Sequence, residues 1–221
     1  MHTAYLCDFD GTICPDDIGA SLVERFGVGD DRAAKGLLER WTRGEVGHRE
    51  LTVAESARLR VEESEARAFA LGFTIDPGFA GFVAEVRGRG DQVMVVSEGF
   101  EFYLADQLAR AGLGDLPFAA NRARFEAGGV VPEFPWSDDG CGRCGNCKAQ
   151  HARRWREQGY RVVMVGDGLS DRCGAEASDA VFARSSLLAW CRERGVPATP
   201  FEGFAALADM VRRATPARRS A

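Results

Sequence analysis

Two aspartates at the end of a short apolar run constrain this chain more than any other feature of its sequence. Leu6-Cys7 leads into Asp8-Phe9-Asp10-Gly11-Thr12, so the two acids stand two positions apart. Side chains alternate between the faces of a strand, and Asp8 and Asp10 therefore share a face if the strand continues. Gly11 lets the backbone turn, which keeps both acids at the carboxyl end of the strand, where open α/β sheets bind ligands. Such close acids repel one another, and a divalent cation removes that repulsion.

Three later segments also place a polar group at the end of a strand or the start of a helix. Residues 92–97 form an apolar run that ends in a hydroxyl, and residues 162–167 form one that ends in a carboxylate, with Asp171 four positions further on. Lys148 follows a segment rich in glycine and cysteine and stands at the start of a predicted helix. Backbone N–H groups and the helix dipole favour an anion at such positions, so the pattern predicts a phosphate site.

The composition of the chain limits the number of domains and the kinds of partner that we expect. The chain has 221 residues, of which 45% are hydrophobic and 28% charged, as expected of one globular domain with a small insert. A net charge of -5 argues against a nucleic-acid partner. No membrane-length apolar run and no signal peptide are visible, so we expect a cytoplasmic protein without a membrane partner. The sequence leaves open whether it is a monomer or a homodimer.

The four motifs together resemble those of the haloacid dehalogenase-like superfamily of aspartate-nucleophile phosphohydrolases, and they extend from Asp8 to Asp171. Within that superfamily the chain is similar to the branch that holds phosphoserine phosphatase and the methionine-salvage phosphatase acting on 2-hydroxy-3-keto-5-methylthiopentenyl-1-phosphate. The Cys-x-x-Cys-x-x-Cys-Lys segment and residues 182–193 favour the second of these. The resemblance implies Mg²⁺-dependent hydrolysis of a small phosphorylated metabolite through an aspartyl-phosphate.

Phosphoryl transfer then suggests a role for each motif residue. Asp8 fits the nucleophile, and Asp10 fits the general acid that later activates water. Mg²⁺ would bind Asp8, the backbone carbonyl of Asp10 and Asp167, while Asp171 holds a metal-bound water or orients a neighbour. Lys148 neutralises the phosphate and Asp8. The other expected contacts to phosphate or substrate are Thr12, Asp16, Ser97, Glu98 and Gly99.

The order of strand-like and helix-like runs predicts an α/β fold with a Rossmann-like, doubly wound, mostly parallel sheet. Its core comprises residues 1–14 and 78–221. Residues 15–77 show helical apolar spacing and are predicted to form a helical cap, which the resemblance places over the active site. Residues 121–135 are predicted to form a β-hairpin centred on Gly128-Gly129, and the tail from Arg212 to Ala221 is expected to fray.

Substrate specificity is less clear from the sequence. Phosphoserine phosphatases carry Glu at the position of Asp16, and usually Asn where this chain has Ser170. Glu98 stands between Ser97 and Gly99, where these families more often have Gly, so it either points away or contacts the substrate or the cap. Phosphoserine phosphatase, phosphomutase and a non-catalytic metal or redox sensor remain alternatives. Other polar candidates in the cap are Asp17, Arg43, His48, Arg49 and Arg60.

The cysteine-rich segment allows two interpretations. Seven cysteines in such a chain are expected to be free thiols or metal ligands. Cys141, Cys144 and Cys147, with His151 four residues further on, could complete a tetrahedral zinc site. However, structural zinc sites usually pair two separated knuckles, whereas these ligands crowd into one segment. We therefore favour a glycine-rich loop of reduced thiols that shapes the phosphate pocket.

Overall fold

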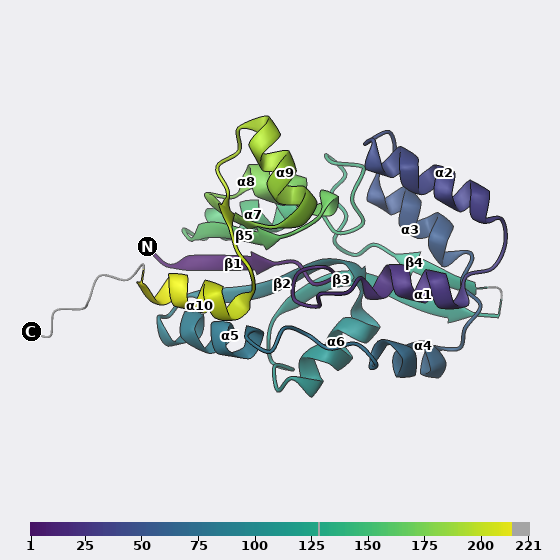
Figure 1. Ribbon diagram of the computed structural model, residues 1–221, viewed down its shortest axis with the longest axis horizontal. Coiled ribbons are helices and arrows are strands. Elements are labelled where there is room, and N and C mark those ends of the chain that lie inside the picture. The colour runs from purple at the N-terminus through teal and green to yellow at the C-terminus, as the bar shows by residue number, and fades with distance from the viewer. Residues whose placement is uncertain (128, 214–221) are drawn as a thin grey trace, which may run out of the picture.

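A single mixed sheet forms the centre of the molecule in the computed structural model, which describes residues 1–127 and 129–213. Its seven strands run in the order β4-β3-β2-β1-β5-β6-β7 (Figure 1). All neighbouring strands are parallel except β3 and β4. The strands are β1 (Thr3–Cys7), β2 (Gln92–Phe100), β3 (Phe118–Glu126), β4 (Gly129–Glu133), β5 (Arg161–Gly166), β6 (Ala180–Ala183) and β7 (Thr199–Pro200).

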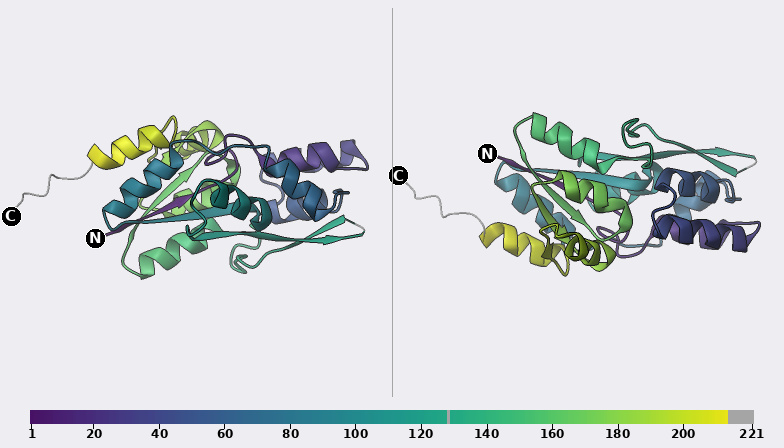
Figure 2. Two further views of the ribbon diagram at one scale, coloured as in Figure 1. Left: turned by 90° about the horizontal axis from the view of Figure 1, so that it is seen from below. Right: turned by 90° about the horizontal axis from the view of Figure 1, so that it is seen from above.

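Helices cover both faces of this sheet, as Figures 1 and 2 show. One face carries α5 (Phe79–Gly88), α6 (Glu101–Arg110) and α10 (Phe204–Arg213); the other carries α7 (Lys148–Glu157), α8 (Arg172–Ala177) and α9 (Ser185–Arg194). Side-chain alternation along β1 explains the two layers, since Tyr5 and Cys7 pack into one apolar core and Leu6 into the other. The predicted doubly wound α/β class is confirmed.

Strand register brings the carboxyl ends of β1, β2 and β5 to one edge of the sheet. Cys7 pairs with Val95 on one side and with Val165 on the other. The residues that follow these strands therefore emerge side by side, at the point where the strand order reverses and α/β sheets bind ligands. Gly11 turns the chain there with a φ of 76°, and a Cβ at this position would lie 2.6 Å from the carboxylate oxygens of Asp167.

Residues 15–77 form four helices beyond that edge: α1 (Ile18–Phe26), α2 (Asp31–Thr42), α3 (His48–Ser56) and α4 (Glu63–Ala70). The side chain of Asp17 starts α1 by accepting a hydrogen bond from Ala20 N at 2.8 Å. No strand lies within the described part of this insert, in agreement with its helical apolar spacing. Figure 1 places the insert at one end of the molecule, with α3 against β4.

The hairpin prediction identified the antiparallel pair of β3 and β4, although β3 begins three residues earlier than expected, at Phe118. Gly128 lies outside the described residues. The fraying predicted from Arg212 onward is wrong for Arg212 and Arg213, because both belong to the last turn of α10; residues 214–221 lie outside the described part of the chain. None of the described helices is long and apolar enough to cross a membrane.

Candidate active site

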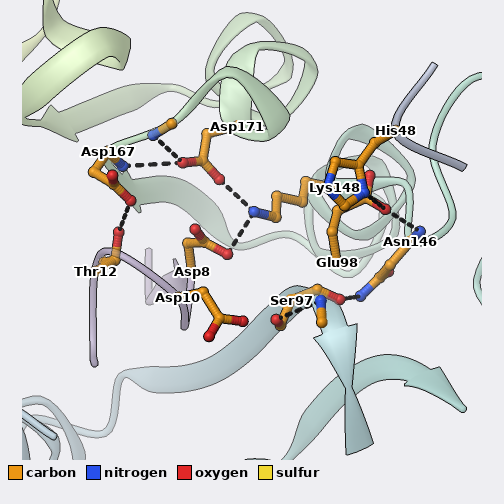
Figure 3. A network of polar contacts seen from close by, with 12 residues as sticks. Asp8, Asp10, Thr12, His48, Ser97, Glu98, Asn146, Lys148, Asp167 and Asp171 are labelled. Carbon is orange, nitrogen blue, oxygen red and sulfur yellow. Dashed lines mark hydrogen bonds and ion pairs between the residues drawn. The ribbon is translucent and has the colours of Figure 1, made fainter. Parts of the chain in front are cut away.

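A buried lysine between two buried carboxylates lies at the carboxyl edge of the sheet (Figure 3). Lys148 Nζ, at the start of α7, donates to Asp8 Oδ1 at 2.6 Å and also to Asp171 Oδ1. The other oxygen of Asp171 accepts the backbone N–H groups of Asp167 and Gly168 at 3.0 and 2.9 Å. Asp171 therefore orients Lys148, which in turn holds one oxygen of Asp8 and leaves the other free.

These groups depend on one another for their charge. Burial lowers the pKa of Lys148, but Asp171 and Asp8 more than offset this, so its pKa lies above the ordinary value and the ammonium stays charged. Burial and the Asp171 carboxylate raise the pKa of Asp8 against the opposing effect of Lys148. Asp8 therefore needs further positive charge nearby if it is to act as an ionised nucleophile.

The carboxylates supply a donor set that suits such a cation. Asp8, Asp167 and Asp171 each have a carboxylate oxygen, and these oxygens lie within 4.8 Å of one another. Hard oxygen donors with excess negative charge fit Mg²⁺. The fully buried hydroxyl of Thr12 donates to Asp167 Oδ1 at 2.8 Å. Thr12, expected to contact phosphate, therefore directs its hydroxyl onto Asp167 instead.

Asp10 lies beside this group in a different environment. Its Oδ1 accepts Ile18 N at 2.9 Å, and its Oδ2 accepts the hydroxyl of Tyr103 at 2.7 Å. Burial and the nearby Asp17 raise the pKa of Asp10 to about 7, although the Tyr103 and Ile18 hydrogen bonds oppose the shift. A carboxyl group with this pKa can give and take a proton near neutral pH. Sequence reasoning missed Tyr103, which lies on α6 and has no local motif.

The segment after β2 begins with Ser97 and Gly99. Ser97 Oγ accepts Gly99 N at 2.9 Å, so its hydroxyl proton remains available to an anionic oxygen in the cavity that Ser97 lines. A Cβ at Gly99 would overlap the Tyr103 hydroxyl and lie 2.6 Å from Asp10 Oδ2. Glycine is therefore required there to let Tyr103 reach Asp10.

Glu98 joins the sheet edge to the helical insert. Its Oε2 accepts Gly145 N at 2.9 Å and Asn146 N at 3.1 Å, and lies 3.2 Å from His48 Nδ1 (Figure 3). Burial raises the pKa of Glu98, but the nearby charges of His48 and Lys148 have the larger effect, and the pKa of Glu98 lies below its ordinary value. Burial lowers the pKa of His48, but the Glu98 carboxylate has the larger effect, and the pKa of His48 lies above its ordinary value. Of the orientations left open by the sequence, Glu98 adopts the one that contacts the insert.

The other oxygen of Glu98 has no hydrogen-bond partner among the described residues, although it is buried. Asn146, which sequence reasoning also missed, supports the same strand end. Its side-chain amide donates to the carbonyl oxygens of Ser97 and Ala119, each at 2.8 Å. Within the described part of the chain, Glu98 Oε1 is therefore a buried acceptor without a partner, in a residue that lines the cavity.

These groups share a cavity of about 390 Å³ with helices α1 to α3. The insert contributes mainly apolar side chains to its wall: Leu22, Val23, Leu38, Trp41, Leu51 and Leu59. His48, Thr52 and Glu55 are among its polar residues. Among the described residues, no Arg or Lys lines this wall.

Several polar candidates in the cap lie elsewhere. Asp16, expected to contact substrate, does not line the cavity, and its neighbour Asp17 does so instead. Arg43 pairs with Glu45, and Arg49 lies over the ring of Phe134. Arg60 donates to the carbonyl oxygens of Ala57 and Leu59, which follow α3. Of the predicted cap residues, only Asp17 and His48 reach the wall.

His151 does not lie with the cysteine thiols as the zinc interpretation required. Its Nε2 is 2.7 Å from Asn146 Oδ1 in a buried position. Burial and the nearby Arg154 lower the pKa of His151 to about 4, so the ring is neutral. The alternative ligand set of three cysteines and His151 is therefore wrong in its fourth member, since among the described residues His151 does not belong to the group of ligand atoms that the three cysteines form.

The family model for haloacid dehalogenase-like hydrolases matches residues 5–176, and the chain belongs to this family. It is 30% identical over 207 residues to the 2-hydroxy-3-keto-5-methylthiopentenyl-1-phosphate phosphatase of Brevibacillus brevis, with 90% of each chain covered. It is 29% identical to the enzyme of the same name from Exiguobacterium sibiricum, over 95% of this chain and 96% of that one. These relationships make the chain a phosphoric monoester hydrolase.

Solved structures share its fold. Phosphoserine phosphatase from T. onnurineus superimposes with a TM-score of 0.72 at 20% identity, covering 97% of this chain and 96% of that one. A substrate-bound phosphoserine phosphatase gives a TM-score of 0.72 at 18% identity, covering 95% and 98%. At this identity the likeness concerns the fold, and it agrees with the α/β class expected from the motifs.

Proposed function

We propose that the chain hydrolyses a small phosphomonoester with an apolar tail, of the kind named for its methionine-salvage relatives, through an aspartyl-phosphate on Asp8. The wall of the cavity carries this proposal. Beyond the phosphate end it offers leucine, valine and tryptophan side chains, and none of its described residues is Arg or Lys. A thioether tail suits such a wall, whereas the carboxylate of phosphoserine would be desolvated without a cationic partner.

The contacts around Asp8 support nucleophilic catalysis. Lys148 holds Asp8 Oδ1, so the second oxygen would attack phosphorus while the bond to the leaving oxygen breaks. Asp10 would donate its proton to that leaving oxygen, then accept one from the water that hydrolyses the aspartyl-phosphate. Ser97 and Lys148 would bind the phosphoryl oxygens. Mg²⁺ held by Asp8, Asp167 and the Asp10 carbonyl would supply positive charge against the same oxygens.

Residues 15–77 would act as a cap over a core of residues 1–14 and 78–221. Core and insert touch where His48 meets Glu98 and where Arg143 donates to the carbonyl oxygens of Gly44 and Val46 at 2.7 and 2.9 Å. A cap over the cavity would exclude water other than the attacking one, and it would favour small substrates over proteins. The free oxygen of Glu98 would accept a hydrogen bond from a substrate hydroxyl at the inner end of this cavity.

Phosphate release from a matched panel tests the proposal. We expect kcat/KM for 2-hydroxy-3-keto-5-methylthiopentenyl-1-phosphate to exceed that for phosphoserine by roughly 10²-fold, since an unpaired buried carboxylate is costly. A simple alkyl phosphate without either tail serves as the control and should fall between them. Equal or faster hydrolysis of phosphoserine would contradict the assignment, and a phosphorylated isomer formed without free phosphate would indicate a mutase.

A further inference from the structure

Four thiols converge on the core side of the cysteine loop, defined here as residues 138–147. Cys141 Sγ lies 3.6 Å from Cys144 Sγ, which lies 3.9 Å from the sulfur of Cys173 in helix α8. Cys147 Sγ lies 3.8 Å from Asp138 Oδ2. The sulfur atoms of the three loop cysteines all lie within 4.8 Å of one another. Three thiols from one loop therefore form a cluster, and a fourth thiol from a separate helix adjoins it through Cys144.

The spacing of this cluster fits a metal ion. A tetrahedral zinc site with Zn–S bonds of about 2.3 Å places its sulfur atoms about 3.8 Å apart. Two of the sulfur separations, 3.6 and 3.9 Å, lie on either side of that value. We infer that Cys141, Cys144, Cys147 and Cys173 form a structural tetrathiolate site for Zn²⁺. Cys173 supplies the separated ligand that the loop alone lacks.

The surroundings of the cluster suit thiolate ligands. Cys147 is the N-cap residue of α7, and its carbonyl oxygen accepts the N–H of Gln150 in the first turn at 3.0 Å. The positive end of the α7 dipole at Cys147 favours a thiolate there and offsets part of the net negative charge of four thiolates on one Zn²⁺. Arg153 lines the same hollow as Cys141, Cys147 and Cys173, where it pairs with the Asp138 carboxylate.

The loop contacts both the catalytic lysine and the insert, so a metal there would have a structural role. Cys147 directly precedes Lys148, and the N–H groups of Gly145 and Asn146 bind Glu98. On the other side, Arg143 donates to two carbonyl oxygens of the insert, and its own carbonyl accepts Arg49 N at 3.0 Å. A fixed loop would therefore position Lys148 and hold the insert against the core.

Metal analysis of the full chain, purified without chelator or added metal, tests this site. We expect about one zinc per chain, released when the four thiols are modified by a mercurial reagent. Protein loaded with Co²⁺ instead should show thiolate-to-cobalt charge-transfer absorption and the intense visible bands of a tetrahedral site. These measurements use the wild-type chain, so they remain informative even if cysteine variants fold poorly.

Variants then identify the ligands. Cys173→Ser should lose zinc, whereas Cys191→Ser should keep it, because Cys191 is buried in α9 within a different apolar cluster. His151→Gln and Asp167→Ala should also retain zinc. Zinc-free wild-type protein with four readily alkylated thiols, or a Cys141–Cys144 disulfide in mass spectrometry, would overturn the proposal. So would zinc that survives Cys173→Ser but is lost in His151→Gln or Asp167→Ala.

Discussion

The two sides of the cavity are built on different physical principles. On the sheet edge, Asp8, Lys148 and Asp171 are buried charges, each bonded to a group from another element. On the insert, side chains such as Leu22 and Trp41 meet the cavity through apolar surface. Removing one partner from a buried ion pair costs about 3–5 kcal/mol, while an apolar wall tolerates exchange of one residue for another. The chemistry is therefore rigidly specified, and the substrate preference can vary with the insert.

The largest expected effect lies on the charged side. Asp8→Asn keeps the shape of the residue but removes the attacking charge, so kcat should fall about 10³-fold or more while the fold survives. Phosphate release and thermal unfolding measure the two quantities. Asp115→Asn, an exchange on the exposed ion pair with Arg87, is the control and should change neither. Retention of more than a small part of the activity by Asp8→Asn would exclude a covalent role.

The second-largest loss of activity is expected when the metal is removed. Chelation should abolish activity, Mg²⁺ should restore it, and Asp167→Asn should lower kcat about 10²-fold with a higher Mg²⁺ requirement, because one carboxylate ligand is lost. Mg²⁺ titration of the rate provides the measurement, with Asp139→Asn on the exposed loop as the control. Full activity in chelator, with metal content verified as negligible, would rule out a metal-dependent mechanism.

The acid can be tested through its pKa. Burial and Asp17 raise the pKa of Asp10 to about 7, so Asp10 is protonated below and ionised above that pH. The first step needs the protonated form, and kcat/KM for an alkyl phosphate should therefore fall as pH rises through about 7. Asp10→Asn should lower this rate about 10²-fold, with a smaller loss for nitrophenyl phosphate, whose leaving group needs little protonation. Equal losses for both esters would argue against Asp10 as the acid.

The variant Tyr103→Phe provides a second test of the pKa of Asp10. The Tyr103 hydroxyl favours the ionised form of Asp10, so its removal should move the alkaline limb of the pH profile to higher pH. Tyr160→Phe, at the end of the sheet remote from the site, is the matched control and should leave the profile in place. An unchanged limb in Tyr103→Phe would mean that another group sets it.

The smallest effect is expected on the apolar side. Trp41→Ala removes a wall residue that packs edge-on against His48, with ring centroids 5.3 Å apart. KM for a substrate with a thioether tail should rise roughly tenfold, while kcat for nitrophenyl phosphate stays within about a factor of two. Parallel kinetics on the two substrates measure this split. A comparable loss of kcat on both would show that the insert also positions the reacting groups.

Local sequence was sufficient for the features that depend on neighbouring residues. Short apolar runs predicted the strands β1, β2 and β5, and helical spacing predicted an insert without strands. The polar residues at the strand ends follow from the same pattern, because parallel strands end at a common edge. The sequence pattern therefore predicts that Ser97, Lys148 and Asp167 lie near Asp8.

Tertiary structure alone decided the partners that come from distant parts of the chain. Tyr103 reaches Asp10 from α6, Asn146 supports the end of β2, and Cys173 joins the thiols of a loop far from it in sequence. His151, four residues from Cys147, instead packs with Asn146. Spacing along the chain indicates which side chains share one element, but it carries no information on which elements pack together. Only burial of the apolar faces in the folded chain determines those contacts.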